Sequence, residues 1–448
     1  MSTMTSIPYA RGRLPVVGHL AAFARAPLGF LSSIPEQGNL VRIKLGSLDA
    51  VVVCDANLTR KLLLDDRVFD KGGQIFDRAY DALRDGLATC PHAVHRRLRP
   101  LIQPTFNPAR IPAYSATMSE KIAAVTESWR DGEVLDVTAE MLKLASSTAA
   151  AVFFGGSELD ATDRDQVMAD MATLFNGVFR VAMMPPSLYR LPIPGNNAHR
   201  DAVMRSRRVL AEIIARHRTS ASGPDSLLSA LLTARSDDGR RLSDAEISDQ
   251  VISFFMAGTD TTATTLAWAL YFVDRNPAVA QRLREEVDNV LGGRVARFED
   301  LSDLQVTKQI ITETLRMRSP VWMLTRKVSE DTELGGYRLP AGTVVLYSNY
   351  VLHHRRDLLP DPDRFDPDRW DPYNPDRPPR DAIIPFGFGP RKCIGDKFAM
   401  TETTLALATI VNRWQLSTLS DREVKPVVSS VIMHPRRLRM RARTRAAS

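Results

Sequence analysis

The chain has 448 residues, of which 44% are hydrophobic and 25% are charged, and its formal net charge is +7. These fractions are ordinary for a globular protein and exclude a largely disordered one, and the length is sufficient to bury a large cofactor. The basic residues are scattered among 52 acidic ones instead of forming one stripe, which argues against a nucleic-acid-binding protein.

The N-terminal segment, residues 1–20, does not have the pattern of a signal peptide. It contains Arg11 and Arg13, two prolines and two glycines, and no continuous apolar stretch. No apolar run approaches the roughly 18 residues that span a bilayer, so we expect no membrane span and a cytoplasmic location. Three cysteines without paired spacing argue against a disulfide framework and agree with a reducing compartment.

In chain order, a β-rich part near residues 36–53 comes first, where two short β-like runs and the turn at Gly46 predict a hairpin. A helical part follows at about 96–316, and a second β-rich part near 322–351. We expect one domain over residues 1–448, mainly α with small β-sheets, since no segment reads as an interdomain linker. Breaks in the regular pattern are expected at residues 104–112, 184–197, 219–226, 291–295 and 360–379.

One long apolar helix is predicted from Ser243, whose capping box includes Glu246, to residue 276 before a proline. Its middle combines a glycine with several hydroxyl side chains, where helix propensity is low. The Thr261 hydroxyl can donate a hydrogen bond to the Ala257 carbonyl four residues back, which would open a local bulge in the helix. Asp260 and Thr261 would then supply an acid and a hydroxyl for proton transfer. The alternative is a polar kink in a core helix.

Glu313 and Arg316 lie three residues apart and therefore on one face of a predicted helix. Such a pair is most often a surface ion pair of little energetic weight. The neighbouring Ile310, Ile311 and Leu315 indicate burial instead, where a paired arginine organises the surrounding chain.

Residues 386–395 form a glycine-punctuated loop that contains Cys393 and precedes a helix-forming sequence. A cysteine becomes a metal ligand as the thiolate, which positive charge, backbone amides and a helix N-terminus favour. Gly389 and Gly395 would let backbone amides and a flat macrocycle approach the sulfur, and Arg391 could pair with a carboxylate of that macrocycle. The alternative is an inert buried cysteine.

The loop resembles the haem-binding loop of the cytochrome P450 family, in which Phe386, Gly389, Arg391, Cys393 and Gly395 occupy every specified position. Residues 257–262 are similar to the oxygen-activation motif of the same family. Residues 313–316 are similar to its Glu-x-x-Arg motif, which an arginine from the irregular segment, here Arg369, completes.

The resemblance implies the cytochrome P450 fold, with haem b between the long central helix and the helix after the cysteine loop. The thiolate of Cys393 would ligate the iron and favour O–O cleavage. The resemblance assigns Phe386, Ala257 and Gly258 to the haem surroundings, together with four residues that would hold the haem propionates: His95, Arg99, Arg326 and Arg391.

The resemblance further implies a monooxygenase that uses O₂ and electrons from a ferredoxin and its NAD(P)H-dependent reductase. Lys392 and Lys397 beside the ligand would belong to a basic docking face for the acidic donor. A peroxide-driven enzyme would lack the pair Asp260 and Thr261, and a haem-thiolate sensor would need an output domain.

A lipophilic substrate is expected, because the candidate pocket segments carry few charges. The candidate segments include a loop at residues 72–89 and an apolar turn at residues 181–188, and the candidate lining residues are Phe254, Phe255, Val321, Trp322 and Ile432. Trp322 would shorten the pocket. Residues 86–92, 95–106, 321–326 and 333–337 are similar to bacterial sesquiterpene oxygenases of the pentalenene and epi-isozizaene type, which implies terpene oxidation in secondary metabolism. A polyketide, a macrolide or a fatty acid is the alternative substrate.

Overall fold

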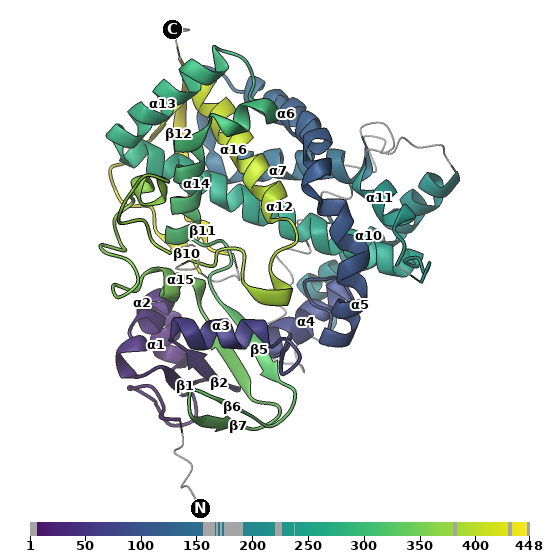
Figure 1. The fold of residues 1–448 in the computed structure, drawn as a ribbon, viewed down its shortest axis with the longest axis vertical. Coiled ribbons are helices and arrows are strands. Elements are labelled where there is room, and N and C mark those ends of the chain that lie inside the picture. Colours follow the sequence, from purple (N-terminus) through teal and green to yellow (C-terminus); the bar gives the residue numbers. More distant parts are fainter. Residues whose placement is uncertain are drawn as a thin grey trace, which may run out of the picture.

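The computed structural model describes residues 7–155, 166, 169–170, 173, 191–219, 226–236, 238–379, 383–428 and 432–445. The predicted mainly α architecture with small sheets is confirmed (Figure 1). The helices are α1 Leu20–Arg25, α2 Pro27–Ser32, α3 Ala56–Leu64, α4 Gln74–Leu83, α5 His92–Ile102, α6 Ile111–Glu127, α7 Val137–Phe154, α10 Pro194–Thr219, α11 Leu227–Thr233, α12 Asp244–Arg275, α13 Pro277–Leu291, α14 Gln305–Met317, α15 Asn349–His353 and α16 Asp396–Arg413. The strands are β1 Leu40–Leu45, β2 Leu48–Val53, β3 Phe69–Asp70, β4 Val134–Asp136, β5 Leu324–Val328, β6 Thr332–Leu334, β7 Tyr337–Leu339, β8 Val344–Tyr347, β9 Trp414–Thr418, β10 Pro426–Val427, β11 His434–Pro435 and β12 Arg439–Thr444.

The two β-rich parts of the sequence join in one five-stranded sheet of order β1-β2-β8-β5-β3. The predicted hairpin is present, but its second strand begins at Leu48 and leaves only Gly46 and Ser47 in the turn. Gly46 has a φ of +62°, a conformation that a side chain disfavours. In Figure 1 this sheet and helices α1–α3 form the lower part of the molecule, and the long helices form the upper part.

The central helix α12 organises the upper part. Its N-terminus has the predicted capping box of Ser243 and Glu246, and it ends before Asn276. It packs against α7, α14 and α16, and most of its side chains are buried, including Trp268. We expected no apolar run long enough to span a membrane, but α7 could do so by length and composition alone. In the fold 61% of that helix is buried, as is typical of a core helix.

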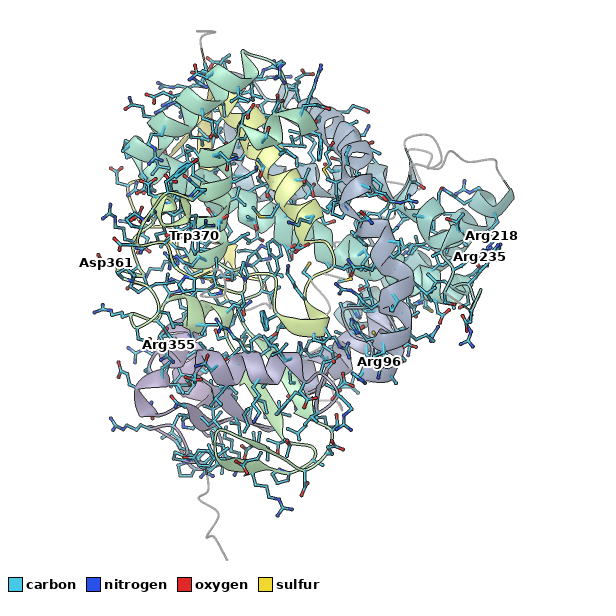
Figure 2. The ribbon with its side chains drawn as sticks, viewed as in Figure 1. Arg96, Arg218, Arg235, Arg355, Asp361 and Trp370 are labelled. Carbon is cyan, nitrogen blue, oxygen red and sulfur yellow. The ribbon has the colours of Figure 1, made fainter. Side chains whose placement is uncertain are left out.

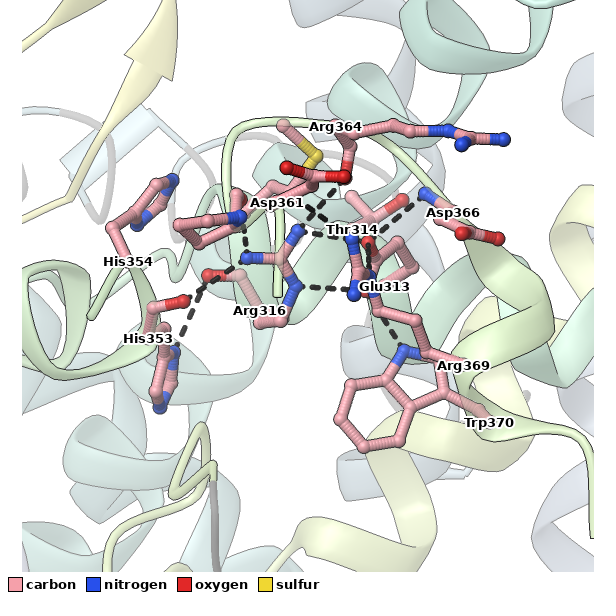
Figure 3. Close-up of polar contacts among 12 residues, drawn as sticks. Glu313, Thr314, Arg316, His353, His354, Asp361, Arg364, Asp366, Arg369 and Trp370 are labelled. Atoms are coloured by element: carbon pink, nitrogen blue, oxygen red, sulfur yellow. Dashed lines mark hydrogen bonds and ion pairs between the residues drawn. The ribbon is translucent and has the colours of Figure 1, made fainter. Parts of the chain in front are cut away.

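A buried ion pair fixes α14 to the irregular segment after α15. Arg316 and Glu313 are both fully buried and form two hydrogen bonds of 2.8 Å. The same guanidinium donates to the carbonyl oxygens of His353 at 3.0 Å, Pro362 at 2.7 Å and Arg364 at 3.1 Å (Figure 3). The burial indicated by the sequence is therefore confirmed, and the arginine holds together chain that has no regular structure of its own.

The carboxylate of Glu313 also collects donors from this segment. The indole of Trp370 donates at 2.8 Å and the backbone N–H of Asp366 at 3.0 Å. Arg369 approaches the same carboxylate at 3.5 Å and donates to the Asp361 carbonyl at 2.8 Å (Figure 3). Glu313, Arg316 and Arg369, which the sequence analysis grouped by resemblance, therefore lie in contact.

We expect the substitution Glu313→Gln to reduce the free energy of unfolding by about 3–5 kcal/mol, because it leaves Arg316 buried without its counter-charge. Chemical denaturation followed by circular dichroism measures the change. The matched control is Arg282→Ala, which breaks the exposed pair with Asp368 and should change stability by less than about 1 kcal/mol. Equal effects of the two substitutions would contradict the organising role of the buried pair.

Candidate active site

A cavity of about 350 Å³ lies between α12 and the cysteine loop. Residues of α3, α4, α7, α12, α14, β5, β8, α15 and α16 line it, so it joins segments that are far apart in the sequence. Apolar residues of the described lining include Leu63, Phe76, Ala88, Phe106, Ala149, Phe153, Phe254, Val321 and Leu324, and polar ones include Lys71, Thr261, Thr262, Thr265, Arg326, Arg391, Cys393, Glu402 and Thr403.

Cys393 lines this cavity and belongs to a loop that backbone hydrogen bonds hold in place. Its backbone N–H donates to the Phe386 carbonyl at 2.8 Å, and Phe386 itself lies in the cavity wall. Gly395 is the N-cap of α16, so the predicted helix begins at Asp396, three residues after Cys393. The loop therefore presents one thiol to the cavity, with a helix N-terminus behind it.

The environment of the thiol is not the purely favourable one that the sequence suggested. Burial raises the pKa of Cys393, while the backbone N–H of Gly395 and the charges of Arg99 and Lys392 lower it. Burial is the largest of these effects, so the pKa is raised, although Cys393 keeps exposed surface. A bound cation at the sulfur would supply the missing stabilisation of the thiolate.

Of three glycines in the site, Gly389 has a different role from the predicted one, whereas Gly258 and Gly395 leave open space. A Cβ atom at Gly389 would lie 2.4 Å from the Leu63 carbonyl oxygen, and its φ is +71°. Gly389 therefore permits close packing of the loop on α3, not the approach of a macrocycle. A Cβ at Gly258 would meet nothing within 4 Å, and one at Gly395 only the Phe106 ring at 3.9 Å. These two glycines do leave open space on the cavity side, as expected.

The predicted side-chain hydrogen bond on α12 is present, since the Thr261 hydroxyl donates to the Ala257 carbonyl at 2.6 Å. The helix nevertheless continues without interruption from 244 to 275, so the expected bulge is not formed. Thr261, Ala257 and Gly258 line the cavity. Asp260 does not belong to the described lining, and its carboxylate lies 3.4 Å from the ring of His434.

Several cations belong to the cavity lining. Arg326 is only 2% exposed, and its Nε and one terminal nitrogen have no hydrogen-bond partner. Lys71, which the sequence analysis missed, also lines the cavity, and its ammonium lies 4.5 Å from the centre of the Phe76 ring. Burial first, and then the charges of Arg326 and Arg391, lower the pKa of Lys71 well below its ordinary value. Among the described residues, neither Arg326 nor the Lys71 ammonium forms an ion pair with a carboxylate.

Arg391 lines the cavity but already has protein partners. Its guanidinium donates to Asp66 at 2.8 Å, to Asp70 at 2.7 Å and to the Cys90 carbonyl at 2.7 Å. The predicted pairing with a cofactor carboxylate would therefore compete with two carboxylates of the chain. No short sequence pattern could reveal this, because Asp66 and Asp70 are more than 300 residues away.

His95 and Arg99 lie one helical turn apart on α5, and neither belongs to the described cavity lining. His95 is buried, and burial lowers its pKa to about 3, with further lowering by Arg391 and Arg99. Arg99 donates to Gln103 at 2.7 Å and to the Lys392 carbonyl at 2.8 Å. Arg99 therefore supports the cysteine loop in this structure.

The predicted substrate wall is correct in part. Phe254 and Val321 line the cavity, but Phe255 is buried in the core against Phe153, with ring centres 6.3 Å apart. Trp322 is fully buried and stacks on Phe23 in the lower part of the molecule, so it does not shorten the pocket. In both cases the neighbouring residue in sequence faces the cavity.

Three further predictions concern the same wall. Ile432 forms a β-bridge with Val321 and is not part of the described lining. Within residues 72–89, which we expected to be a loop, α4 spans Gln74–Leu83, and Phe76 and Ala88 face the cavity. Residues 181–188 lie outside the described residues.

Comparisons with known proteins agree with this geometry. Residues 8–442 match the family described as Cytochrome P450. The chain belongs to the cytochrome P450 family. It is 42% identical to a pentalenene oxygenase of Streptomyces avermitilis, with 97% of each chain covered. It is 40% identical to a cyclooctat-9-en-7-ol 5-monooxygenase of Streptomyces melanosporofaciens, over 91% of this chain and 89% of that protein.

A solved structure shows the same fold. The crystal structure of the cytochrome P450DA heme domain superposes with a TM-score of 0.87 at 27% identity, covering 99% of this chain and 98% of that one. This P450 is therefore a haem-thiolate oxidoreductase, and its cofactor is haem b with a cysteine-ligated iron.

The residues of the cavity fit this cofactor. The Cys393 thiol faces the space from one side, and the open position beside Gly258 leaves room on the other. The buried, unpartnered nitrogens of Arg326 and the nearby Lys71 suit the two haem carboxylates. We expect these two cations to hold the propionates more directly than Arg391.

Glu402 on α16 is a second cavity residue that the sequence analysis missed. It is 2% exposed, and one of its oxygens has no hydrogen-bond partner. Burial raises its pKa to about 8, although the nearby Thr148 hydroxyl opposes the shift. The P450 therefore carries a largely neutral carboxylic acid beside its cavity at neutral pH.

This acid predicts a pH-dependent stability. The pKa of Glu402 in the folded state lies above its ordinary value. Below about pH 4.5 the carboxyl is neutral in the folded and in the unfolded protein, so it does not reduce the free energy of unfolding. As the pH rises to about 8, the unfolded state is increasingly favoured because the carboxyl ionises more easily there, and stability is lost. The loss amounts to at most about 1.4 kcal/mol per pH unit. We expect Glu402→Gln to remove that slope and to be more stable than the wild type at pH 8. Urea denaturation of both proteins between pH 5 and pH 8 (about three units) measures it, and identical slopes would contradict the assignment.

Proposed function

We propose that this cytochrome P450 is a monooxygenase that hydroxylates a terpene, most specifically a sesquiterpene, in secondary metabolism. The observation that carries the proposal is the composition of the cavity wall. Its cations Lys71, Arg326 and Arg391 suit the haem carboxylates, and much of the remaining described lining is apolar, including Phe106, Phe254, Val321 and Leu324. A hydrocarbon fits such a wall, whereas a carboxylate would need a cation of its own.

The names of the relatives support this substrate class. One relative is a pentalenene oxygenase, another a cyclooctat-9-en-7-ol 5-monooxygenase, and a third a cyclooctatin synthase. All three names describe enzymes, which favours catalysis over the alternative of a haem-thiolate sensor. We also infer that residues 1–448 act as one domain in the cytoplasm.

When bound, haem supplies the electron transfer and the oxidising chemistry of the reaction. The chain itself binds the substrate and moves protons. The apolar wall orients a hydrocarbon and excludes water from it. The Thr261 hydroxyl lies in the cavity and has one proton, which it donates to the Ala257 carbonyl. It can donate to oxygen when it rotates away from that carbonyl. Asp260, the next residue on the helix, would be the acid that resupplies the proton.

The substrate class is tested by titrating the purified holoenzyme with a sesquiterpene hydrocarbon, a diterpene alcohol, a fatty acid and a macrolide. Displacement of water by a substrate changes the spin state of the haem and therefore its absorption. We expect a full change with a terpene, and little with the fatty acid or the macrolide. A full change with the fatty acid alone would overturn the proposed substrate class but not the monooxygenase chemistry.

We further propose that an acidic ferredoxin, reduced by an NAD(P)H-dependent reductase, docks over the cysteine loop. Lys397 is exposed beside the ligand, and Arg96 lies on the surface of α5 (Figure 2). Lys392 contributes less net charge than expected, because its ammonium pairs with Asp396 at 2.5 Å. The free cation nearest to the sulfur in sequence is therefore Lys397.

We expect Lys397→Glu to raise the KM for ferredoxin by about threefold to tenfold at low salt, and the difference should disappear near ~0.5 M salt. Reduction by dithionite should not change, because it bypasses docking. Arg11→Glu is the matched control, since it reverses an exposed charge in the N-terminal segment, away from the cysteine loop. An unaltered KM in the Lys397 variant would place the donor on another face.

A further inference from the structure

His434 contacts the carboxylate that we assign to proton supply. Its Nε2 lies 3.4 Å from Oδ2 of Asp260, and its Nδ1 lies 3.0 Å from the hydroxyl of Thr264. Asp260 and Thr264 are four residues apart and so share one face of α12. Both ring nitrogens are therefore engaged on the same helix, and a proton on Nε2 points at the carboxylate.

The position of the ring does not depend on Asp260 alone. His434 begins β11, which is paired with β10. The preceding residue, Met433, is fully buried; its carbonyl accepts from the Trp268 indole at 2.8 Å, and its N–H donates to the Pro320 carbonyl at 2.9 Å. The backbone thus holds the imidazole against α12 from two sides.

His434 is more exposed than Asp260, and Thr261 faces the cavity. The His434 side chain is 27% exposed, that of Asp260 is 13% exposed, and Thr261 lines the cavity. We propose that His434 is a proton-entry residue, which passes protons from solvent to Asp260 for use at Thr261. The inference rests on the proposed roles of Asp260 and Thr261.

The proton balance of this step is simple. Hydroxylation with O₂ consumes two electrons from the donor and two protons, and one oxygen atom leaves as water. An imidazolium transfers the proton on Nε2 to Oδ2 of Asp260, which gives a neutral imidazole and a carboxylic acid. The imidazole then takes a proton from solvent. Histidine suits this task because it takes up and releases protons near neutral pH.

The charges around the ring are of both signs. On α12 the charged group in contact with His434 is Asp260. On its own segment Arg436 and Arg437 follow in an exposed turn, and Lys425 beside β10 is exposed as well. The ring therefore lies between one carboxylate on α12 and an exposed stretch of the chain that carries three cations.

The test compares His434→Gln with the wild-type holoenzyme. Glutamine can still donate a hydrogen bond to Asp260 but cannot pass on a proton at neutral pH. Turnover is supported by a ferredoxin, its reductase and the terpene that gives the largest spin-state change. The measurements are product formed per NAD(P)H consumed, and the solvent deuterium isotope effect on product formation.

We expect His434→Gln to lower product per NAD(P)H by at least about fivefold and to enlarge the isotope effect. The decrease should stay below the 10²–10⁴-fold typical of a general acid itself, because water can still protonate Asp260 slowly. The spin-state titration and the absorption of the reduced CO complex should not change. Arg436→Gln, which removes an exposed charge from the adjoining turn, should behave as the wild type.

Two reference variants separate the possible failures. Asp260→Asn and Thr261→Ala should each uncouple NAD(P)H consumption from product. If Asp260→Asn has no effect, the proposed role of Asp260 is wrong and the inference about His434 is overturned with it. If Asp260→Asn uncouples the enzyme but His434→Gln matches the wild type, His434 only orients Asp260 and the proton-entry role alone is overturned.

Discussion

The guanidinium of Arg391 is the contact on which the site depends. It is almost completely buried and joins the cysteine loop to Asp66, Asp70 and the carbonyl of Cys90. A buried guanidinium is tolerated only where charge and hydrogen bonds compensate it, so the loop cannot shift without exposing two carboxylates as well. This clamp fixes the depth of the Cys393 sulfur against the lower part of the molecule. The helix α16 fixes it against the upper part.

The clamp also explains why the cations divide their tasks. Two carboxylates of the chain satisfy Arg391, while the nitrogens of Arg326 remain buried without a partner. Unpartnered buried donors are costly, and a lysine whose pKa is lowered well below its ordinary value lies beside them. A ligand with two carboxylates would remove this cost, so binding of haem stabilises the fold at the same place where it completes the site.

Patterns that depend only on a short spacing along a helix were reliable predictors of local contacts. The capping box of Ser243, the bond from Thr261 and the pair of Glu313 with Arg316 depend on spacings of three or four residues, and all three are present. Predictions that needed the direction of a side chain were wrong at Phe255 and Trp322, because a one-residue step turns the side chain to another face.

The residues that were missed lack a local signal altogether. Lys71 stands in an ordinary turn, and Glu402 looks like one polar position on a helix. Each becomes unusual only through burial by segments far away in sequence. Long-range packing also gave Gly389 a role different from the predicted one. Its neighbour is the backbone of α3, more than 300 residues earlier, and no pattern within the loop can indicate that contact.

The continuous helix around Asp260 and Thr261 constrains how protons can reach the cavity. On an uninterrupted helix, adjacent side chains point about 100° apart, and here one lies against His434 while the other faces the cavity. A bulge could have brought both side chains to the same side, but none is present in α12. A proton on Asp260 must therefore reach the cavity side of α12 by rotation of the Asp260 side chain or through water, without a change in the helix backbone. His434, which contacts Asp260 outside the cavity lining, then also sets how often the Asp260 side chain turns toward the cavity.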